Sequence, residues 1–268
     1  MAVSRKSAPD SFPGIFAPML ATLADKPVNS SDWLYEVKWD GYRAIAYVNE
    51  GAVEIISRNG KSFNEKFYPI FNELEQLGMD VVLDGEVVAL NSKGGADFSA
   101  LQGWRSEDDG LLIFYVFDLL YHNGKDLCNT PLTERRKLLR EVISETNSLR
   151  VSKTFEGSGD EAFAFAASLG LEGVIAKKAD SLYLPGKRSK EWLKVKTEKH
   201  QEAVIGGYTI NEGTPKPFSA LLLGVYEGNE FRYIGPVGTG FSVSLQKEIL
   251  QRLKPLETPA CPFPSVPE

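Results

Sequence analysis

Residues 36–43, Glu-Val-Lys-Trp-Asp-Gly-Tyr-Arg, constrain the fold more than any other stretch of the chain. A strand-like apolar run, residues 33–37, leads into Lys38, and the alternation ends at Asp40-Gly41, a pair typical of tight turns. A second strand-like run follows at residues 42–48. The pattern predicts a strand–turn–strand unit that aims the lysine in a fixed direction. The alternative is an ordinary surface lysine beside a hairpin turn.

The composition bounds the class of protein. With 268 residues, 43% apolar and 25% charged, the chain is expected to be a soluble globular protein of one large or two smaller domains. It has no apolar run of membrane-spanning length, and residues 1–14 are expected to be a flexible tail. Two cysteines without a Cys-x-x-Cys and two histidines argue against a zinc site or a disulfide framework. A cytoplasmic location, without a membrane partner, fits best.

The charge is unevenly distributed. The net charge is −6, which argues weakly against a surface coated with positive charge. Residues 177–199 nevertheless hold eight basic and three acidic residues, a local balance of 8 − 3 = +5. A local positive strip suits a ligand that carries phosphate. The alternative is a charged loop in contact with solvent.

The element pattern predicts an α+β first domain, residues 15–199, with mixed or antiparallel sheets. The apolar run 111–121 is short, aromatic and β-branched, which favours a buried strand over a helix. Thr130-Pro131 is a typical helix start, and a second helix is expected at residues 159–169. Strands at 173–176 and 192–195 enclose the basic loop.

The character of the sequence changes near residue 200. Residues 200–268 contain three strand-like runs and a helix at 242–253, followed by a proline-rich end. An oligonucleotide-binding (OB) β-barrel needs five strands. The second domain is therefore either a different fold or a truncated OB-fold that lacks its last strands.

Common phosphate-binding and nucleophile motifs are missing. Gly60-Lys61-Ser62 ends like a P-loop, but Ile55 occupies the position of the required glycine. The chain has no Gly-x-Gly-x-x-Gly and no Gly-x-Ser-x-Gly. A dinucleotide fold, a kinase glycine loop and a hydrolase elbow are excluded on these grounds.

Lysines and glutamates at strand ends remain as candidate chemical groups. Lys194 and Lys196 alternate with Leu193 and Val195, so the two lysines share one face of a strand. Together with Lys38 and two glutamates they would suit nucleotidyl transfer, because nearby positive charge favours a neutral amine that can attack phosphorus. The alternative is an amphipathic edge strand. Phe117 also has two interpretations: its ring stacks on a nucleobase, or it is an ordinary core residue.

Six short motifs in a fixed order carry a family resemblance. They are residues 38–43, 57–60, 84–86, 115–120, 172–177 and 192–196. Each is weak alone, but the ordered set resembles the ATP-dependent DNA ligases, within the covalent nucleotidyltransferases. The chain looks most like the ligase module of bacterial LigD-type end-joining ligases. The resemblance implies an adenylation (nucleotidyltransferase, ATP-grasp-like) domain followed by a partial OB-fold domain.

The resemblance also implies roles for individual residues. Lys38 is the catalytic nucleophile that forms lysyl-AMP from ATP. Glu172 is the first candidate for a metal ligand by resemblance, with Glu86 as a second ligand of Mg²⁺ or Mn²⁺. The implied nucleotide-binding residues are Glu36 at the adenine edge, Arg43, Arg58, Glu86 at the ribose, Phe117 against the adenine ring, and Lys194 and Lys196 at the α-phosphate.

Partners and alternatives follow from the same resemblance. The expected substrate is nicked or broken duplex DNA, with Ku and polymerase and phosphoesterase modules as end-joining partners at the bacterial nucleoid. An RNA ligase or an mRNA guanylyltransferase shares Lys-x-Asp-Gly and stays an alternative. A non-catalytic nucleotide- or DNA-binding module is the alternative from another class.

Family members carry a basic motif at the end of the OB domain that orients the pyrophosphate, and no counterpart follows Leu253. We therefore expect lysine adenylation from ATP to be weak in this chain relative to a complete ligase. Sealing of an already adenylated nick, which needs no pyrophosphate departure, should suffer less. Parallel rate measurements on both substrates check this, and equal competence in the two assays would contradict it.

Overall fold

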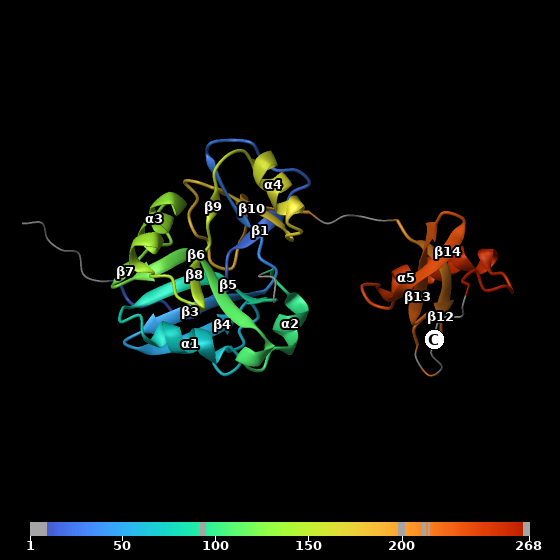
Figure 1. Ribbon diagram of the computed structural model, residues 1–268, viewed down its shortest axis with the longest axis horizontal. Coiled ribbons are helices and arrows are strands. Elements are labelled where there is room, and N and C mark those ends of the chain that lie inside the picture. The colour runs from blue at the N-terminus through green and yellow to red at the C-terminus, as the bar shows by residue number, and fades with distance from the viewer. Residues whose placement is uncertain (1–9, 92–94, 198–201, 211–212, 214, 265–268) are drawn as a thin grey trace, which may run out of the picture. The chain divides into compact units, whose positions relative to one another are not determined.

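The computed structural model describes residues 10–91, 95–197, 202–210, 213 and 215–264. The chain divides into two compact units, Met1–Glu198 and Lys199–Glu268 (Figure 1). Within the described residues, no helix is long and apolar enough to cross a membrane. The α+β class with mixed and antiparallel sheets is confirmed.

One sheet of the first unit has five strands in the order β1–β11–β10–β2–β9. Their bounds are Leu20–Leu23 (β1), Trp33–Val37 (β2), Thr154–Phe155 (β9), Gly173–Lys178 (β10) and Arg188–Lys196 (β11). β1 runs parallel to β11, and the other neighbours are antiparallel. The strands predicted at 33–37, 173–176 and 192–195 are all in this sheet.

The second sheet follows the path β4–β3–β5–β6–β7, and β8 pairs with β6. The bounds are Tyr42–Asn49 (β3), Ala52–Ser57 (β4), Val81–Leu90 (β5), Leu111–His122 (β6), Lys125–Asp126 (β7) and Leu149–Val151 (β8). β6 is the buried strand that the apolar run 111–121 predicts. Asp84-Gly85-Glu86 lies inside β5, and Gly85 is required there because a Cβ would lie 2.5 Å from the Phe114 ring.

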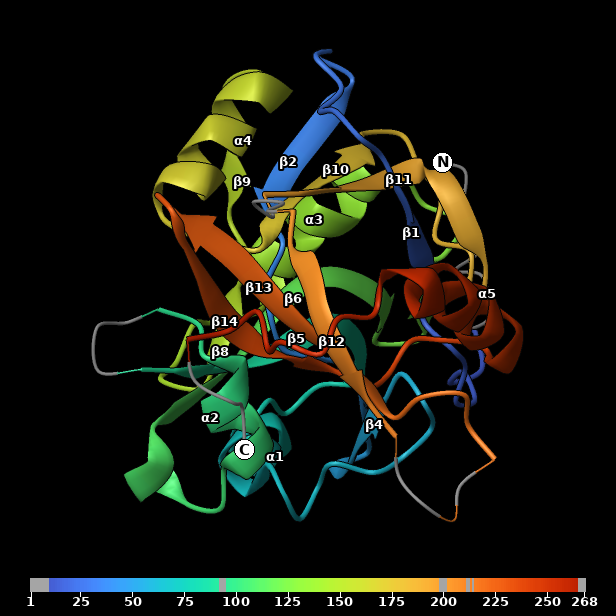
Figure 2. The same cartoon turned by 90° about the vertical axis from the view of Figure 1, so that its right-hand side faces the viewer.

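Helices pack against the strands of both sheets. Their bounds are Tyr68–Glu75 (α1), Phe98–Gly103 (α2), Leu132–Val142 (α3) and Gly159–Ser168 (α4), with a 3₁₀ turn at Glu107–Asp109. α4 begins where it does because Ser158 and Glu161 form a capping box. α4 packs against β10 and β2, and Figure 2 shows it beside β2. The helices predicted at Thr130-Pro131 and 159–169 are confirmed.

Three apolar clusters fill the layers of the first unit. The largest, which includes Phe67, packs α1 and α2 against the six-stranded sheet. A smaller one around Ala162 packs α4 against the five-stranded sheet. The third lies between the two sheets and contains Ile45, Phe117 and Trp192. The inner faces of both sheets therefore meet in one cleft, and this cleft holds the candidate site.

Lys38 lies on a crossover between the sheets and not in a hairpin. β2 and β3, predicted as a strand–turn–strand unit, belong to different sheets, so the hairpin alternative is wrong. Over the described residues from Leu20 to Lys196, the chain passes between the sheets twice, at residues 38–41 and 152–153. The Trp39 indole N–H donates to Ser152 Oγ at 3.2 Å and ties the two crossovers together.

The N-terminal tail can be described only in part, because residues 1–9 lie outside the described residues. From Asp10 onward the chain lies against the six-stranded sheet. Asp10 N–H donates to the Gly124 carbonyl at 2.7 Å, and the Phe12 ring packs edge-on against Tyr121 with centroids 5.0 Å apart. The flexible tail at 1–14 and the domain bounds 15–199 and 200–268 stay predictions.

The second unit contains the predicted strands and helix. β12 (Val204–Thr209), β13 (Ala220–Glu227) and β14 (Glu230–Val237) form an antiparallel sheet in that order. α5 (Val243–Leu253) begins at the Ser242 cap and is followed by a 3₁₀ turn, Lys254–Leu256. The rings of Phe231 and Phe263 stack at 5.0 Å over Gly206 and Gly224, where a Cβ would meet them. These two glycines let the small core close.

Gly41 offers a test of how tightly the crossover is packed. A Cβ at this position would lie 2.1 Å from the Val87 carbonyl oxygen, so Gly41→Ala must move the 38–41 segment. We expect the free energy of unfolding to fall by about 1–3 kcal/mol, the usual range for overpacking. Gly103→Ala is the matched control, since nothing lies within 4 Å of the Cβ that this substitution would add. Urea unfolding measures both, and an equal effect of the two substitutions would contradict the prediction.

Candidate active site

A cavity of about 190 Å³ opens between the two sheets of the first unit. It is lined by Met19, Leu20, Ala21, Glu36, Val37, Lys38, Trp39, Arg43, Arg58, Glu86, Phe117, Ile175, Lys177, Arg188, Trp192 and Lys194. The lining combines apolar walls with several cations and two carboxyl groups. Such a mixture suits an aromatic ligand that carries negative charge.

Strand register explains one wall of the cavity. In β2, β10 and β11, Glu36 pairs with Ile175, and Ile175 pairs with Lys194, so these three residues form a row across the sheet. All three line the cavity. Leu193 and Val195 face the other way, toward α4 and the core. The predicted alternation along β11 is confirmed.

Lys38 and Glu172 are brought together by the next row of the same sheet. The Lys38 N–H donates to the Gly173 carbonyl at 2.9 Å, directly beyond the end of β2. The Lys38 ammonium forms an ion pair with the Glu172 carboxylate, and the two side chains are 18% and 23% exposed. Glycine is required at position 173, where a Cβ would lie 2.1 Å from the Val195 carbonyl oxygen of β11. The predicted nucleophile and metal ligand are therefore in contact.

The opposite wall comes from the six-stranded sheet. Arg43 of β3 pairs in register with Glu86 of β5, and both line the cavity. The Arg43 guanidinium donates to both Asp84 carboxylate oxygens, at 2.5 and 2.6 Å, and lies 4.3 Å from the Phe117 ring centroid. Burial lowers the pKa of Arg43, but Asp84 more than reverses this, so the net pKa is raised. Arg43 is a permanent cation beside the Phe117 ring.

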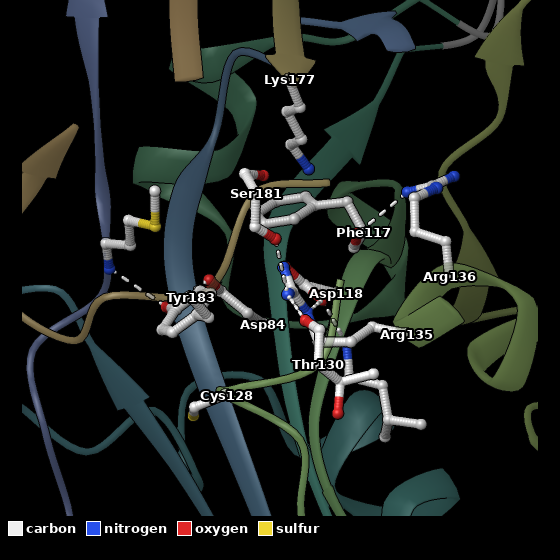
Figure 3. A network of polar contacts seen from close by, with 12 residues as sticks. Asp84, Phe117, Asp118, Cys128, Thr130, Arg135, Arg136, Lys177, Ser181 and Tyr183 are labelled. Atoms are coloured by element: carbon white, nitrogen blue, oxygen red, sulfur yellow. Dashed lines mark hydrogen bonds and ion pairs between the residues drawn. The ribbon is translucent and has the colours of Figure 1, made fainter. Parts of the chain in front are cut away.

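Asp84 is held in turn by Tyr183. The Tyr183 hydroxyl donates to Asp84 Oδ2 at 2.7 Å and accepts from the Met19 N–H at 3.1 Å, as Figure 3 shows for the labelled side chains. Burial raises the pKa of Tyr183 well above its usual value. The hydroxyl therefore stays protonated and can donate at neutral pH. Tyr183 connects the loop between β10 and β11 to the arginine of the site.

Glu86 is a carboxyl group with unusual protonation. Burial raises its pKa from 4.5 to about 8, and Asp84 and Glu172 act in the same direction, against the opposing charges of Arg43 and Lys38. At neutral pH the ligand-free Glu86 is therefore mostly protonated and can donate a hydrogen bond. A cation bound nearby would favour its ionised form.

Glu36 belongs to a buried cluster at the cavity wall whose other members, Arg136 and Lys177, were not predicted as site residues. The Glu36 carboxylate accepts from Arg136 at 2.9 Å and from Lys177 at 3.1 Å. Burial and the charge of Arg136 lower the pKa of Lys177 to about 8, while Glu36 opposes the shift. The Lys177 ammonium lies 4.2 Å from the Phe117 ring centroid and 4.4 Å from that of Trp192. The sequence signal that could have identified Lys177 is its position two residues after Ile175, because residues two apart in a strand share one face.

The predicted residues do not all lie in the lining. Glu36, Lys38, Arg43, Arg58, Glu86, Phe117 and Lys194 line the cavity, whereas Glu172 and Lys196 do not. Glu172 reaches the site through Lys38, and Lys196 lies opposite Gly173 on β11. Burial, followed by the charges of Lys38, Arg188 and Lys196, lowers the pKa of Lys194. Arg188 and Trp192 line the cavity without having been predicted as site residues.

The residues at the site could hold a hard divalent cation only together with a bound ligand that supplies phosphate oxygens. Among the described residues, no group of three or more His, Cys, Asp or Glu side chains could hold a metal ion. Glu86 and Glu172 supply carboxylate oxygens, the donors that Mg²⁺ and Mn²⁺ prefer. Mg²⁺ in nucleotide sites usually takes one or two carboxylates and fills its shell with phosphates and water. The two glutamates meet that requirement.

Comparison with protein families assigns the chain. The family model described as "ATP dependent DNA ligase domain" matches residues 18–196. The chain belongs to the ATP-dependent DNA ligase family. A second model, "ATP dependent DNA ligase C terminal region", matches residues 214–268. Membership in this family favours a DNA ligase over an RNA ligase or an mRNA guanylyltransferase.

Individual relatives in the ligase family agree. The chain is 40% identical over 262 residues to the multifunctional non-homologous end joining protein LigD of Pseudomonas aeruginosa, covering 95% of this chain and 31% of LigD. It is 41% identical to LigD of Mycobacterium tuberculosis over 251 residues, 92% and 32% of the two chains. The chain thus spans about a third of these relatives. The DNA ligase-like protein LigB of a Bacillus subtilis prophage is 34% identical over 72% of each chain.

Solved structures support the same fold. A mycobacterial DNA ligase D complexed with ATP and MES matches with a TM-score of 0.66 and 38% identity, covering 94% of this chain and 82% of that one. The ligase domain of Mycobacterium tuberculosis LigD matches with a TM-score of 0.64 and 39% identity over the same shares. These matches and the family models confirm an adenylation domain followed by an OB-fold domain.

Glu86 gives a pH-dependent prediction. Its pKa is higher in the folded chain than in the unfolded one, so its contribution to stability is present below pH 4.5 and is lost as pH rises to about 8. Glu86→Gln removes this dependence. We expect the variant to gain stability relative to the wild type, by about 1 kcal/mol or more at the upper end of that window.

Urea unfolding at about pH 5 and about pH 8 measures this gain. Glu75→Gln, at an exposed position at the end of α1, is the control and should follow the wild type at both pH values. A gain that is the same at both pH values, or larger at the lower one, would contradict the raised pKa of Glu86.

Proposed function

We propose that this chain is the catalytic core of a LigD-type ATP-dependent DNA ligase that seals 3′-hydroxyl/5′-phosphate breaks. The observation that carries the proposal is the placement of Lys38. Its ammonium pairs with Glu172 at the edge of a cavity whose lining combines cations from both sheets with the Phe117 ring. Family membership supports the activity, but the chain spans about a third of the LigD relatives.

Lys38 is the nucleophile of the first of three transfers and the leaving group of the second. Its Nζ attacks the α-phosphorus of ATP, an N–P bond forms, and pyrophosphate leaves with the electrons of the broken P–O bond. The 5′-phosphate of the DNA then takes the AMP and frees Lys38. The 3′-hydroxyl finally attacks the adenylated phosphate, and AMP leaves. Positioning and charge stabilisation supply most of the rate in such transfers.

The base and sugar positions follow from the cavity walls. Phe117 and Ile175 offer apolar faces from opposite sheets, suited to the two sides of an adenine ring. The Glu36 carboxylate is engaged by Arg136 and Lys177, so the edge of the base is read by the backbone at the end of β2. Glu86 hydrogen-bonds a ribose hydroxyl, as a donor while it is protonated and as an acceptor once a bound cation ionises it.

The phosphates face the cations. Arg43 and Arg58 contact the phosphates or ribose from the six-stranded sheet, and Lys194 and Lys196 contact the α-phosphate from β11. Glu172 and Glu86 would hold Mg²⁺ or Mn²⁺, which when bound neutralises charge on the phosphate oxygens. Because Glu172 now pairs with Lys38, taking up a cation would also release the amine.

End joining is the cellular setting we propose. The LigD relatives are named as multifunctional end-joining proteins. The substrate is nicked or broken duplex DNA, and Ku together with polymerase and phosphoesterase modules are the proposed partners. The location is the bacterial cytoplasm, at the nucleoid during repair.

Covalent labelling tests the central step. With ATP labelled at the α-phosphate, we expect the wild type to gain a stable label and Lys38→Ala to gain none. Lys26→Ala, at an exposed lysine away from the cavity, is the control and should label as the wild type does. Label from GTP but not ATP would overturn the ligase in favour of a guanylyltransferase. Undiminished label in Lys38→Ala would overturn the assignment of the nucleophile.

A further inference from the structure

A second cavity lies beyond the Lys38 strand and takes no part in the proposed reaction. Its volume is about 450 Å³, within the range of small-molecule sites. Val37 and Trp39 line both cavities, so the end of β2 separates them. The other lining residues come from β6, the segment 145–155 and α4.

The walls of this cavity are aromatic and held in place. Trp39 and Tyr115 stack face to face, with centroids 3.7 Å apart and planes 8° apart, and the Trp39 indole N–H is fixed by Ser152. Phe155 and Phe165 meet edge to face at 5.2 Å on the α4 side. Phe165 is 49% exposed, so part of its ring is open to solvent at the cavity.

Positive charge lies at the rim of the same cavity. Arg150 and Lys153 line it, and Glu145 is the acid among the described lining residues. Glu145 is engaged by the Val151 N–H at 3.1 Å. An adjoining cavity of about 330 Å³ shares Lys153 and Glu145 and adds Arg140 at its rim. The rim therefore carries three cations, Arg140, Arg150 and Lys153, and one acid, Glu145, among the described lining residues named here, which would favour an anionic group at this place.

We propose that this aromatic–basic groove binds a nucleobase that carries a phosphate. Flat aromatic walls stack on any base, and lysine and arginine at the rim pair with phosphate, the combination by which proteins hold single strands. The ligand has two sources, a free mononucleotide or a nucleotide within single-stranded DNA. Binding in the groove does not depend on adenylation at Lys38, because the groove residues tested below lie outside the first cavity.

Binding measurements on the full chain test the groove. The site variant is Phe165→Ala with Lys153→Ala, both exposed enough to change without unfolding the chain. The control variant is Leu169→Ala with Lys137→Ala, an exposed pair outside the groove. Thermal unfolding checks that both variants keep the wild-type fold. Labelled oligothymidylate is titrated by fluorescence anisotropy, and AMP by calorimetry.

If the source is single-stranded DNA, oligothymidylate affinity falls about tenfold in the site variant and is unchanged in the control, as expected for loss of one base stack. Lys153→Ala alone should reduce the slope of log K against log salt by about 0.7. If the source is a free nucleotide, the wild type and the control show two AMP binding events and the site variant shows one. Unchanged binding of both probes in the site variant overturns the proposal.

Photocross-linking locates the bound strand independently. Oligothymidylate with one 5-iododeoxyuridine should cross-link to Tyr115, Phe155 or Phe165, as identified by peptide mass spectrometry. Saturating free AMP should suppress these cross-links if both ligands use the groove. Binding of the strand with cross-links only at residues outside the groove would overturn the strand as its ligand, leaving the calorimetric result to decide for or against the free nucleotide.

Discussion

The site depends on one buried carboxylate, that of Glu36, which lies between Arg136 and Lys177. The arrangement joins three elements, because Arg136 extends from α3, Lys177 from β10 and Glu36 from β2. Arg136 also donates to the carbonyls of Phe117, at 2.9 Å, and Ser152, at 2.5 Å. Removing one partner of a buried pair typically costs about 3–5 kcal/mol, since the other charge is left uncompensated. One arginine thus fixes the strand of Lys38, the strand of Phe117 and a crossover.

A parallel pair strengthens the same helix. Arg135 donates to both carboxylate oxygens of Asp118, at 2.7 and 2.8 Å, and to the Ser181 carbonyl at 3.0 Å (Figure 3). Each of two consecutive arginines of α3 therefore links β6 to the side of the five-stranded sheet, Arg135 through Ser181 and Arg136 through Glu36. Because both are buried, their charges hold structure and do not reach substrate phosphates. The exposed cations Arg58 and Arg188 are placed for that role.

Local sequence patterns predict the strands and the row of site residues. The alternation of Lys194 with Leu193 and Val195 determines which face each takes, and the apolar run 111–121 becomes a buried strand because length and composition leave little else. Ordered motifs placed Lys38 and Glu172 in one site. What these patterns share is that a few neighbouring residues determine the outcome.

The features that could not be predicted from the sequence depend on contacts between residues far apart in the chain. That β2 and β3 lie in different sheets is decided by β10 and β5, which come much later in the chain. Arg136 meets Glu36 across 100 residues and Lys177 meets it across 141, so no local pattern predicts either contact. The raised pKa of Glu86 depends on burial, which also appears only once both sheets are assembled.

The two crossovers have a mechanical consequence. The sheets are linked by backbone at residues 38–41 and 152–153, and Trp39 and Ser152 bind these links to each other. Two adjacent links form a pivot, and points close to a pivot move least when its arms rotate. Lys38 is beside this pivot. Rotation of one sheet against the other would therefore displace Lys38 less than it displaces residues at the far ends of the sheets.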